Sequence, residues 1–278
     1  MRFTVKVPGS CGELVQGTLD GEPFLITCPI NLFTSVTISD EFSEQVGLGW
    51  KAKTMLSTVL EYLGCNAFNF GITLESELPI GKGMASSSAD IAAVGKAVAL
   101  ALGSDLKAEE IATLATAIEP TDGVFFDRIV AMNPLTGQIL SKLNLSSEYK
   151  IAIFDFGGEV DTLDFKRQSN FNLTKLPDTF DLEMATQSAL ANQKILCKPQ
   201  LEDIIHFAKS MDALGITNAH TGTVIGVVFA EDTNQSYIEN FSSALTRKFP
   251  HITFLAAVKQ ISGGFYTDYR SKSICSTS

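Results

Sequence analysis

The order of hydrophobic and polar positions predicts short strands alternating with helices along the chain. β-Branched and aromatic residues cluster between Gly, Pro and Asp residues, which predicts strands at 4–7, 24–27, 33–38 and 68–74. Apolar residues at helical spacing predict helices at 51–63, 85–102 and 107–118. Residues 85–102 are rich in alanine and apolar on nearly every face, as is typical of a helix in the centre of a domain.

The pattern changes after Pro120, which makes a domain boundary near residue 140 plausible. Short strands are expected around Phe125, Val130 and Ile139, with a polar loop over 157–181. The remaining elements are strands at 150–156, 223–229, 252–257 and 265–268 and helices at 182–196, 200–214 and 236–249. We therefore predict the α+β class, with domains at 1–140 and 141–278.

Composition narrows the class of protein. The chain has 278 residues, 45% hydrophobic and 19% charged, which is typical of a compact globular protein. Its net charge of −10 argues against nucleic acid or an anionic membrane as a partner. The first residues resemble a strand rather than a secretory signal, and the five cysteines are widely spaced without a C-x-x-C pair. We expect a cytoplasmic protein without a disulfide framework or a zinc cluster.

A glycine- and serine-rich stretch, residues 79–90, lies between a predicted strand and the predicted central helix. Glycines let the backbone approach a ligand, and the N–H groups of a helix N-terminus attract phosphate. A serine hydroxyl could ligate Mg²⁺, and Lys82 could neutralise phosphate. A serine-capped helix with a glycine turn remains an equal alternative. The predicted cofactor-binding residues are Pro79, Gly81, Lys82, Gly83, Met84, Ala85, Ser86, Ser87 and Ser88.

Two familiar phosphate-binding motifs are excluded. A Walker loop needs glycine at the position of Ser76 and a hydroxyl at that of Gly83. The dinucleotide pattern G-x-G-x-x-G has Ser86 at its third position, and the expected βαβ half-domain is missing.

The same stretch resembles the second motif of the GHMP kinase superfamily, P-x-x-x-G-L-G-S-S-A-A, with Ala85 in place of a glycine. Residues 8–17 are similar to its first motif, with Ser10 at the position of the family's lysine, and residues 221–226 resemble its glycine-rich third motif. The resemblance implies a GHMP-kinase-like two-domain fold. It would have an N-terminal mixed β/α domain that binds ATP and a C-terminal ferredoxin-like α/β sandwich.

The details of these motifs, with 119–122 and 219–223, look like the branch of the superfamily that acts on L-threonine. This resemblance implies ATP and Mg²⁺ as cofactors and L-threonine as substrate. The product would be O-phospho-L-threonine, for the aminopropanol linker of cobalamin. The alternatives are a homoserine kinase or another small-alcohol GHMP kinase, and a non-catalytic ATP-binding regulatory protein. The sequence leaves open whether the protein is a monomer or a homodimer.

Phosphoryl transfer needs an in-line hydroxyl, a metal on the phosphates and usually a carboxylate that orients the nucleophile. The resemblance implies Asp122 as the catalytic base and Glu119 as a metal ligand, and the Ser87 hydroxyl is the second candidate metal ligand; acids at a helix exit are the alternative. The candidate substrate contacts, with Glu13 for the ammonium, are Ser10, Cys11, Glu13, Gln16, Thr121, His220, Thr221, Gly222 and Thr223. His220 is equally compatible with a structural role. The polar segment 157–162 is a candidate to reach the substrate or a solvated connector.

Overall fold

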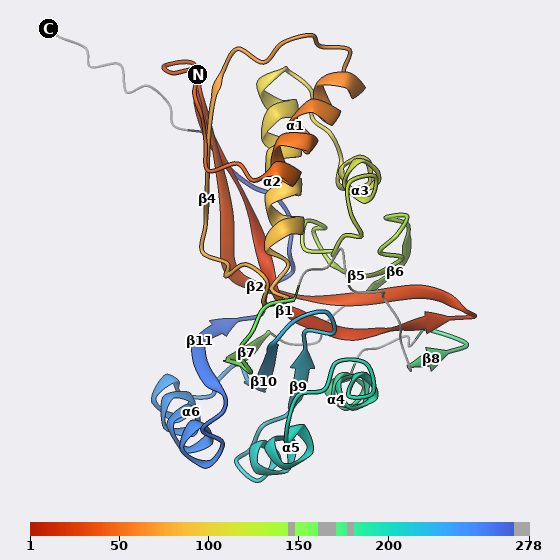
Figure 1. Cartoon of the computed structure of the whole chain (residues 1–278), viewed down its shortest axis with the longest axis vertical. Helices are drawn as coiled ribbons and strands as arrows, with labels where there is room; N and C mark the ends of the chain where they lie inside the picture. The colour runs from red at the N-terminus through yellow and green to blue at the C-terminus, as the bar shows by residue number, and fades with distance from the viewer. Residues whose placement is uncertain (144–147, 161–170, 177–180, 270–278) are drawn as a thin grey trace, which may run out of the picture.

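A long antiparallel hairpin forms the spine of the computed structural model, which describes residues 1–143, 148–160, 171–176 and 181–269 (Figure 1). Its strands are β1 (Arg2–Leu19) and β2 (Glu22–Ser39). Within the described residues one 12-stranded sheet has the order β11-β7-β10-β9-β1-β2-β4-β3. The hairpin therefore joins the strands of the first half to those of the second.

Three helices cover the sheet in the first half: α1 (Trp50–Tyr62), α2 (Ser86–Ala101) and α3 (Ala108–Thr116). Helix α2 contacts α1, α3, β1 and β2, as the apolar pattern predicts for a central helix. Gly95 makes close packing between α2 and α1 possible, because an added Cβ would lie 2.4 Å from Met55 Cε. The strands on this side are β3 (Gln45–Val46), β4 (Gly71–Ser76), β5 (Ile129–Met132) and β6 (Ile139–Leu143).

The second half follows the βαββαβ order of a ferredoxin-like sandwich, with two helices rather than one in the first connection. Its antiparallel strands have the order β11-β7-β10-β9, and α4, α5 and α6 lie below them in Figure 1. The elements are β7 (Tyr149–Asp155), α4 (Leu182–Asn192), α5 (Leu201–Lys209), β9 (Gly215–Asn218), β10 (Val224–Ala230), α6 (Gln235–Lys248) and β11 (Thr253–Lys259). The short strands β8 (Asn172–Leu173) and β12 (Tyr266–Tyr269) pair with β1. The predicted α+β class is confirmed, while the boundary at residue 140 stays a prediction.

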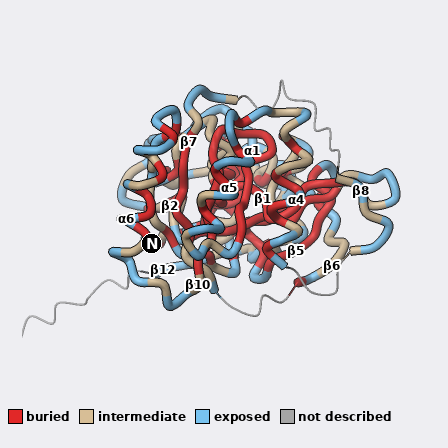
Figure 2. Tube along the Cα trace, turned by 90° about the horizontal axis from the view of Figure 1, so that it is seen from below, coloured by how far each residue is buried: buried red, intermediate tan, exposed pale blue. Residues whose placement is uncertain are grey.

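Strand β7 is buried on both faces, as its continuous apolar run indicates (Figure 2). Ile151 and Ile153 belong to the core beneath the first half, whereas Ala152 and Phe154 belong to the core beneath α5 and α6. Side chains of successive residues point to opposite faces of a strand, so one strand serves two cores.

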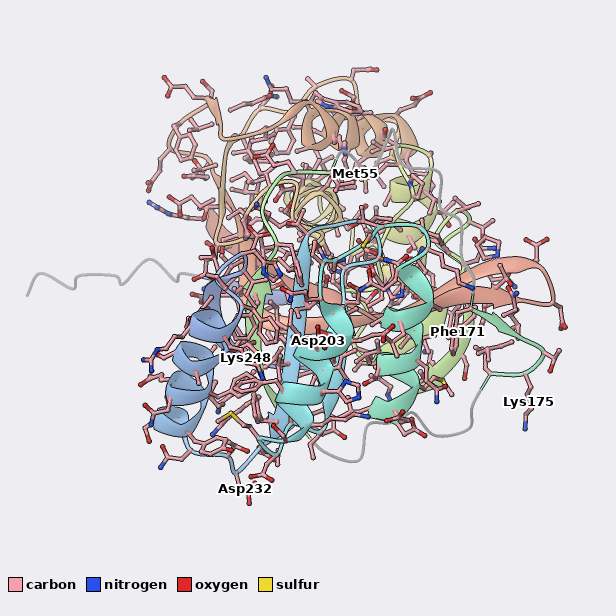
Figure 3. All side chains as sticks on the ribbon, turned by 60° about the horizontal axis from the view of Figure 1, so that its bottom comes forward. Met55, Phe171, Lys175, Asp203, Asp232 and Lys248 are labelled. Carbon is pink, nitrogen blue, oxygen red and sulfur yellow. The ribbon has the colours of Figure 1, made fainter. Side chains whose placement is uncertain are left out.

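Side chains fill the space between the two outer helices α5 and α6 (Figure 3). Phe207 of α5 stacks on Phe241 of α6 with ring centroids 6.2 Å apart, and Lys248 Nζ lies 4.7 Å from the Phe207 ring. Phe241 also contacts Phe229 of β10, with centroids 5.0 Å apart. The aromatic layer thus attaches both helices to the sheet.

Three expectations about strands were wrong or incomplete. No strand forms at Phe125; this fully buried side chain packs against Phe126 and Phe265 within a turn. Strand β1 continues through residues 8–17, with irregular pairing between Pro8 and Val15. Strand β9 lay outside the predicted elements, because its four residues are too few to give a periodic signal. No helix in the described part of the chain is long and apolar enough to cross a membrane.

The aromatic layer gives a prediction for stability. We expect Phe241→Ala to lower the free energy of unfolding by about 3–5 kcal/mol, because the cavity left behind adds to the lost burial of the ring. Leu255→Ala is the control, since Leu255 is 40% exposed on β11 and should cost about 0.5 kcal/mol or less. Urea denaturation measures both free energies of unfolding. Equal losses of stability in the two variants would contradict the assignment of Phe241 to the core.

Candidate active site

A cavity of about 390 Å³ lies where the two halves of the molecule meet. Segments distant in sequence form its wall: the beginnings of α1 and α2, the segment after α3, strand β1 and the turn after β9. Its lining residues are Glu13, Gly49, Trp50, Lys51, Ala52, Ile80, Gly81, Gly83, Met84, Ala85, Ser86, Ser87, Ser88, Asp90, Glu119, Pro120, Asp122, Glu159, Val160 and Thr221. Most of the predicted phosphate-binding stretch therefore borders one cavity with Glu119 and Asp122.

The beginning of α2 has the form of an anion cradle. Ala85 precedes the helix with φ +56°, in the left-handed region that favours glycine, and its side chain gives no capping hydrogen bond. Gly49 precedes α1 at the same cavity and also gives none. Two helix N-termini without a side-chain cap therefore border the cavity, and their N–H groups favour an anion.

Glu119 links the beginnings of the two helices. Ser87 donates its hydroxyl hydrogen to Glu119 Oε1, and Lys51 Nζ lies 2.5 Å from Glu119 Oε2. The Glu119 side chain is only 2% exposed, so its partners satisfy a charge that would otherwise be costly to bury. The structure thus brings the predicted metal pair into direct contact and adds Lys51.

Asp122 lies beside the next residue of α2. Its Oδ2 accepts a hydrogen bond of 3.1 Å from the Ser88 hydroxyl, and its backbone N–H donates to Ser88 Oγ at 3.2 Å. This reciprocal contact fixes the carboxylate at the cavity wall, one residue along the helix from Ser87. The predicted base and the predicted metal ligands are therefore adjacent.

Ser87 and Glu119 suit a magnesium ion. Mg²⁺ prefers oxygen ligands and is usually held by one or two carboxylates together with substrate phosphates and water. A hydroxyl and a carboxylate oxygen in contact fit that donor set. Among the described residues no group of three or more His, Cys, Asp or Glu side chains forms a self-sufficient metal cluster.

A third carboxylate, Asp90, borders the same cavity. Burial raises the pKa of Asp90 to about 6; the hydrogen bond from Thr34 opposes the rise and the negative charge of Glu119 adds to it. The cavity wall therefore holds clustered negative charge, so an anionic ligand needs compensating positive charge there.

The turn between β9 and β10 closes the cavity from the second half. Gly222 packs on Gly83, since a Cβ added at Gly222 would lie 2.4 Å from Gly83 Cα and 2.3 Å from the Lys82 carbonyl oxygen. Thr223 N–H donates to that oxygen at 3.0 Å. Of this turn, Thr221 lines the cavity, whereas Gly222 and Thr223 hold the predicted phosphate-binding loop by packing and hydrogen bonds.

The structure corrects the role expected of Lys82. Its Nζ lies 2.7 Å from Asp155 Oδ2 and donates to the Gly158 carbonyl, outside the cavity lining. Although burial acts to raise the pKa of Asp155, hydrogen bonds from Lys82, Thr223 and Gly157 bring that pKa below its usual value. Lys82 is thus a structural partner of Asp155 rather than a free cation in the cavity.

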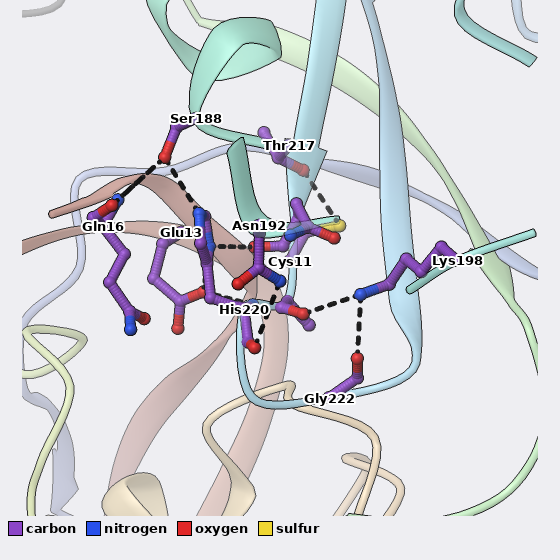
Figure 4. Close-up of polar contacts among 11 residues, drawn as sticks. Cys11, Glu13, Gln16, Ser188, Asn192, Lys198, Thr217, His220 and Gly222 are labelled. Atoms are coloured by element: carbon purple, nitrogen blue, oxygen red, sulfur yellow. Dashed lines mark hydrogen bonds and ion pairs between the residues drawn. The ribbon is translucent and has the colours of Figure 1, made fainter. Parts of the chain in front are cut away.

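A buried polar chain fixes Glu13 (Figure 4). Glu13 Oε2 lies 2.9 Å from the backbone N of His220, which donates to it, and 3.0 Å from His220 Nδ1. His220 Nε2 lies 2.9 Å from Ser188 Oγ on α4, and Gln16 N–H donates to that hydroxyl at 3.1 Å. Glu13 lines the cavity, whereas His220 and Gln16 stand behind it and orient it.

Lys198 supports the same turn from the interior (Figure 4). Its ammonium donates to the carbonyl oxygens of Ala219 and Gly222, each at 2.9 Å, and the residue is 3% exposed. Burial lowers the pKa of Lys198 from 10.5 to about 8, and the negative charge of Glu13 acts in the opposite direction.

Four other candidates do not reach the cavity. Ser10 N–H donates to the Met84 carbonyl at 3.0 Å and so anchors the loop. Cys11 is fully buried against Thr217 and is not among the residues that line the cavity; its burial raises the pKa of its thiol to about 12. Thr121 is fully buried and its N–H donates to Pro134 O. Pro79 lies outside the lining, at the entry to the loop.

The polar segment that begins at Gly157 does reach the cavity. Glu159 and Val160 line it, and Val160 N–H donates to the Gly81 carbonyl at 3.0 Å. Asp161 and Thr162 lie outside the described residues.

Sequence reasoning missed Lys51, Asp90, Ser188 and Lys198. Asp90 ends the recognised motif and could have been included on that ground. The other three lie in ordinary helical or loop sequence, and their roles depend on contacts between segments distant in the chain.

Comparison with known proteins shows what the chain resembles. Residues 51–132 match the family model described as GHMP kinases N terminal domain. A homoserine kinase from Cytophaga hutchinsonii has the same fold, with a TM-score of 0.62 and 17% identity over 96% of this chain and 97% of that one. The resemblance to the GHMP kinase superfamily is confirmed, and the findings support a small-molecule kinase.

More similar in sequence are two L-threonine kinases. The protein from Citrobacter freundii is 26% identical over 265 residues, covering 87% of this chain and 91% of the relative. The one from Salmonella typhimurium is 28% identical over 246 residues, covering 80% of this chain and 81% of the relative.

The buried lysine gives a pH prediction. Below about pH 8 the folded state must bury a charged ammonium, whereas between about 8 and 10.5 the unfolded chain binds a proton that the folded one lacks. Across this window the free energy of unfolding of the unaltered protein should therefore rise with pH relative to that of Lys198→Met. The difference should grow by at most about 1.4 kcal/mol per pH unit. Urea denaturation at pH 7.5, 9 and 10 measures the difference. If the free energy of unfolding changes with pH in the same way in both proteins, the prediction is wrong.

Proposed function

We propose that the protein is an ATP-dependent kinase that phosphorylates the side-chain hydroxyl of L-threonine. The observation that carries this proposal is the single cavity in which Ser87 contacts Glu119 and Ser88 contacts Asp122 at the beginning of α2. The similarity to two L-threonine kinases over most of the chain supports L-threonine as the acceptor.

The phosphate chain of ATP would lie against the beginning of α2. Its oxygens would accept hydrogen bonds from N–H groups of residues 83–88, and Ser86 adds a hydroxyl. Ser87 and Glu119 would hold Mg²⁺, which when bound neutralises phosphate charge. The exposed ring of Trp50 and the exposed Ile80 border the mouth of the cavity and offer apolar surface to the nucleoside.

Asp122 would act as the general base. The threonine hydroxyl oxygen forms a bond to the γ-phosphorus, the bond from that phosphorus to the bridging β-phosphate oxygen breaks, and ADP leaves. The hydroxyl proton passes to an oxygen of the Asp122 carboxylate. The Ser88 hydroxyl donates to this carboxylate and accepts a hydrogen bond from the Asp122 backbone N–H, so the orientation of the side chain is set before the substrate arrives.

Glu13 would receive the ammonium group of the amino acid. It lines the cavity, and His220 fixes its carboxylate by two N–H contacts from the side away from the cavity. Thr221 lies on the same wall and offers a hydroxyl. O-Phospho-L-threonine made here would supply the aminopropanol linker of cobalamin, in the cytoplasm.

A panel of hydroxy amino acids tests the acceptor. With ATP and Mg²⁺, we expect L-threonine to be preferred over L-serine in kcat/KM by roughly 10–200-fold, the range that one methyl group gives. Product mass and phosphate position are determined by mass spectrometry. A preference for homoserine would favour a different small-alcohol kinase, and nucleotide binding without any product would favour a regulatory protein.

The proposed base predicts the effect of one variant. Asp122→Asn should lower kcat by about 10²- to 10⁴-fold while ATP binding stays nearly unchanged, because the amide cannot take the hydroxyl proton. Asp127→Asn, an exposed position five residues further along the same segment, is the matched control and should keep full turnover. If Asp122→Asn also keeps full turnover, another group serves as the base.

A further inference from the structure

The charges around the cavity are mostly negative, so a polyanion needs a positive group to bind there. Among the described residues that line it, Lys51 alone has a cationic side chain, whereas five lining residues carry carboxylates: Glu13, Asp90, Glu119, Asp122 and Glu159. We propose that Lys51 binds the phosphate chain of the nucleotide and that Glu119 positions its ammonium for this contact. The proposal rests on the proposed kinase function and adds a phosphate-binding residue to it.

The position of Lys51 suits this role. Its Nζ lies 2.5 Å from Glu119 Oε2, while the other oxygen of the same carboxylate contacts the Ser87 hydroxyl. One carboxylate therefore separates the ammonium from the beginning of α2. Lys51 and Glu119 both line the cavity, and the Lys51 side chain is 18% exposed whereas that of Glu119 is only 2% exposed, so the lysine is the more accessible partner of the pair.

Two other lysines near the cavity are already engaged elsewhere. Lys82 pairs with Asp155 and donates to the Gly158 carbonyl. Lys198 is buried behind the turn and donates to two carbonyl oxygens. Neither lines the cavity, so neither meets a ligand there without giving up its present contacts.

The location of Lys51 on its helix supports a role in ligand binding. It is the second residue of α1, and the helix dipole disfavours a cation in the first turn. No acidic residue in that turn offsets the charge, so the compensating carboxylate comes from Glu119, 68 residues away. An ion pair that only attaches α1 to the segment after α3 would explain the contact too, but its loss would not depend on the number of phosphates in the ligand.

Nucleotide binding tests the proposal. Adenosine, ADP and ATP are titrated calorimetrically into the full-length protein with EDTA present, so that no divalent cation masks the effect of the lysine. We expect Lys51→Met to weaken ATP binding about 10- to 100-fold, as for loss of a charge-assisted hydrogen bond, and to change adenosine binding by less than about 2-fold. Lys51→Arg should restore most of the loss. Lys53→Met, at an exposed position of the same helix, should bind like the unaltered protein.

The outcomes separate failure of this proposal from failure of the proposed function. Equal ATP affinity in Lys51→Met and the unaltered protein overturns the proposal while leaving the kinase in place. Equal weakening of adenosine and ATP indicates a structural ion pair and also overturns it. If the unaltered protein binds no nucleotide, the proposed function fails and this proposal with it. Thermal unfolding checks each variant, and Lys51→Gln replaces Lys51→Met if the latter does not fold.

Discussion

The backbones of Gly83 and Gly222 pack directly against each other, and the cavity depends on this contact. Each position must lack a side chain, since a Cβ at Gly83 would lie 2.5 Å from Ala219 Cβ and one at Gly222 would lie 2.3 Å from Lys82 O. The contact brings the glycine- and serine-rich loop before α2 against the turn between β9 and β10. At this separation the beginning of α2 and Thr221 border one cavity.

Buried side chains also hold the turn between β9 and β10 from the interior of the protein. Lys198 and Asn192 donate to its carbonyl oxygens, and His220 within it pairs with Glu13 and Ser188. A buried polar network of this kind stabilises one arrangement when its members are satisfied and is costly when one is removed. The network therefore fixes the wall that would contact the acceptor, while the exposed residues Trp50 and Ile80 also line the cavity.

Local signals in the sequence predicted most helices and the residues at the beginning of α2. Helix periodicity and the glycine–serine stretch depend on neighbours in the chain, so 85–102 corresponds closely to α2 (Ser86–Ala101). Strand predictions failed where pairing with a partner strand decides whether a segment becomes a strand. The Phe125 segment has strand-like residues but packs as a turn, and 8–17 contains Pro8, Gly9 and Gly12 yet remains in β1 because β2 pairs along most of it.

The charge of the site shows why its remaining residues could not be predicted. The net charge of −10 and the carboxylates of the cavity wall both oppose binding of a nucleotide, so attraction must come from features that act over a few ångströms. The N-termini of α1 and α2 supply part of it, and the Lys51 ammonium on Glu119 and a divalent cation at Ser87 would supply the rest. Both helix ends are visible in the sequence, but their convergence on Glu119 is a product of folding. A chain whose total charge repels its ligand can still bind it when a few positive groups are brought together at short range.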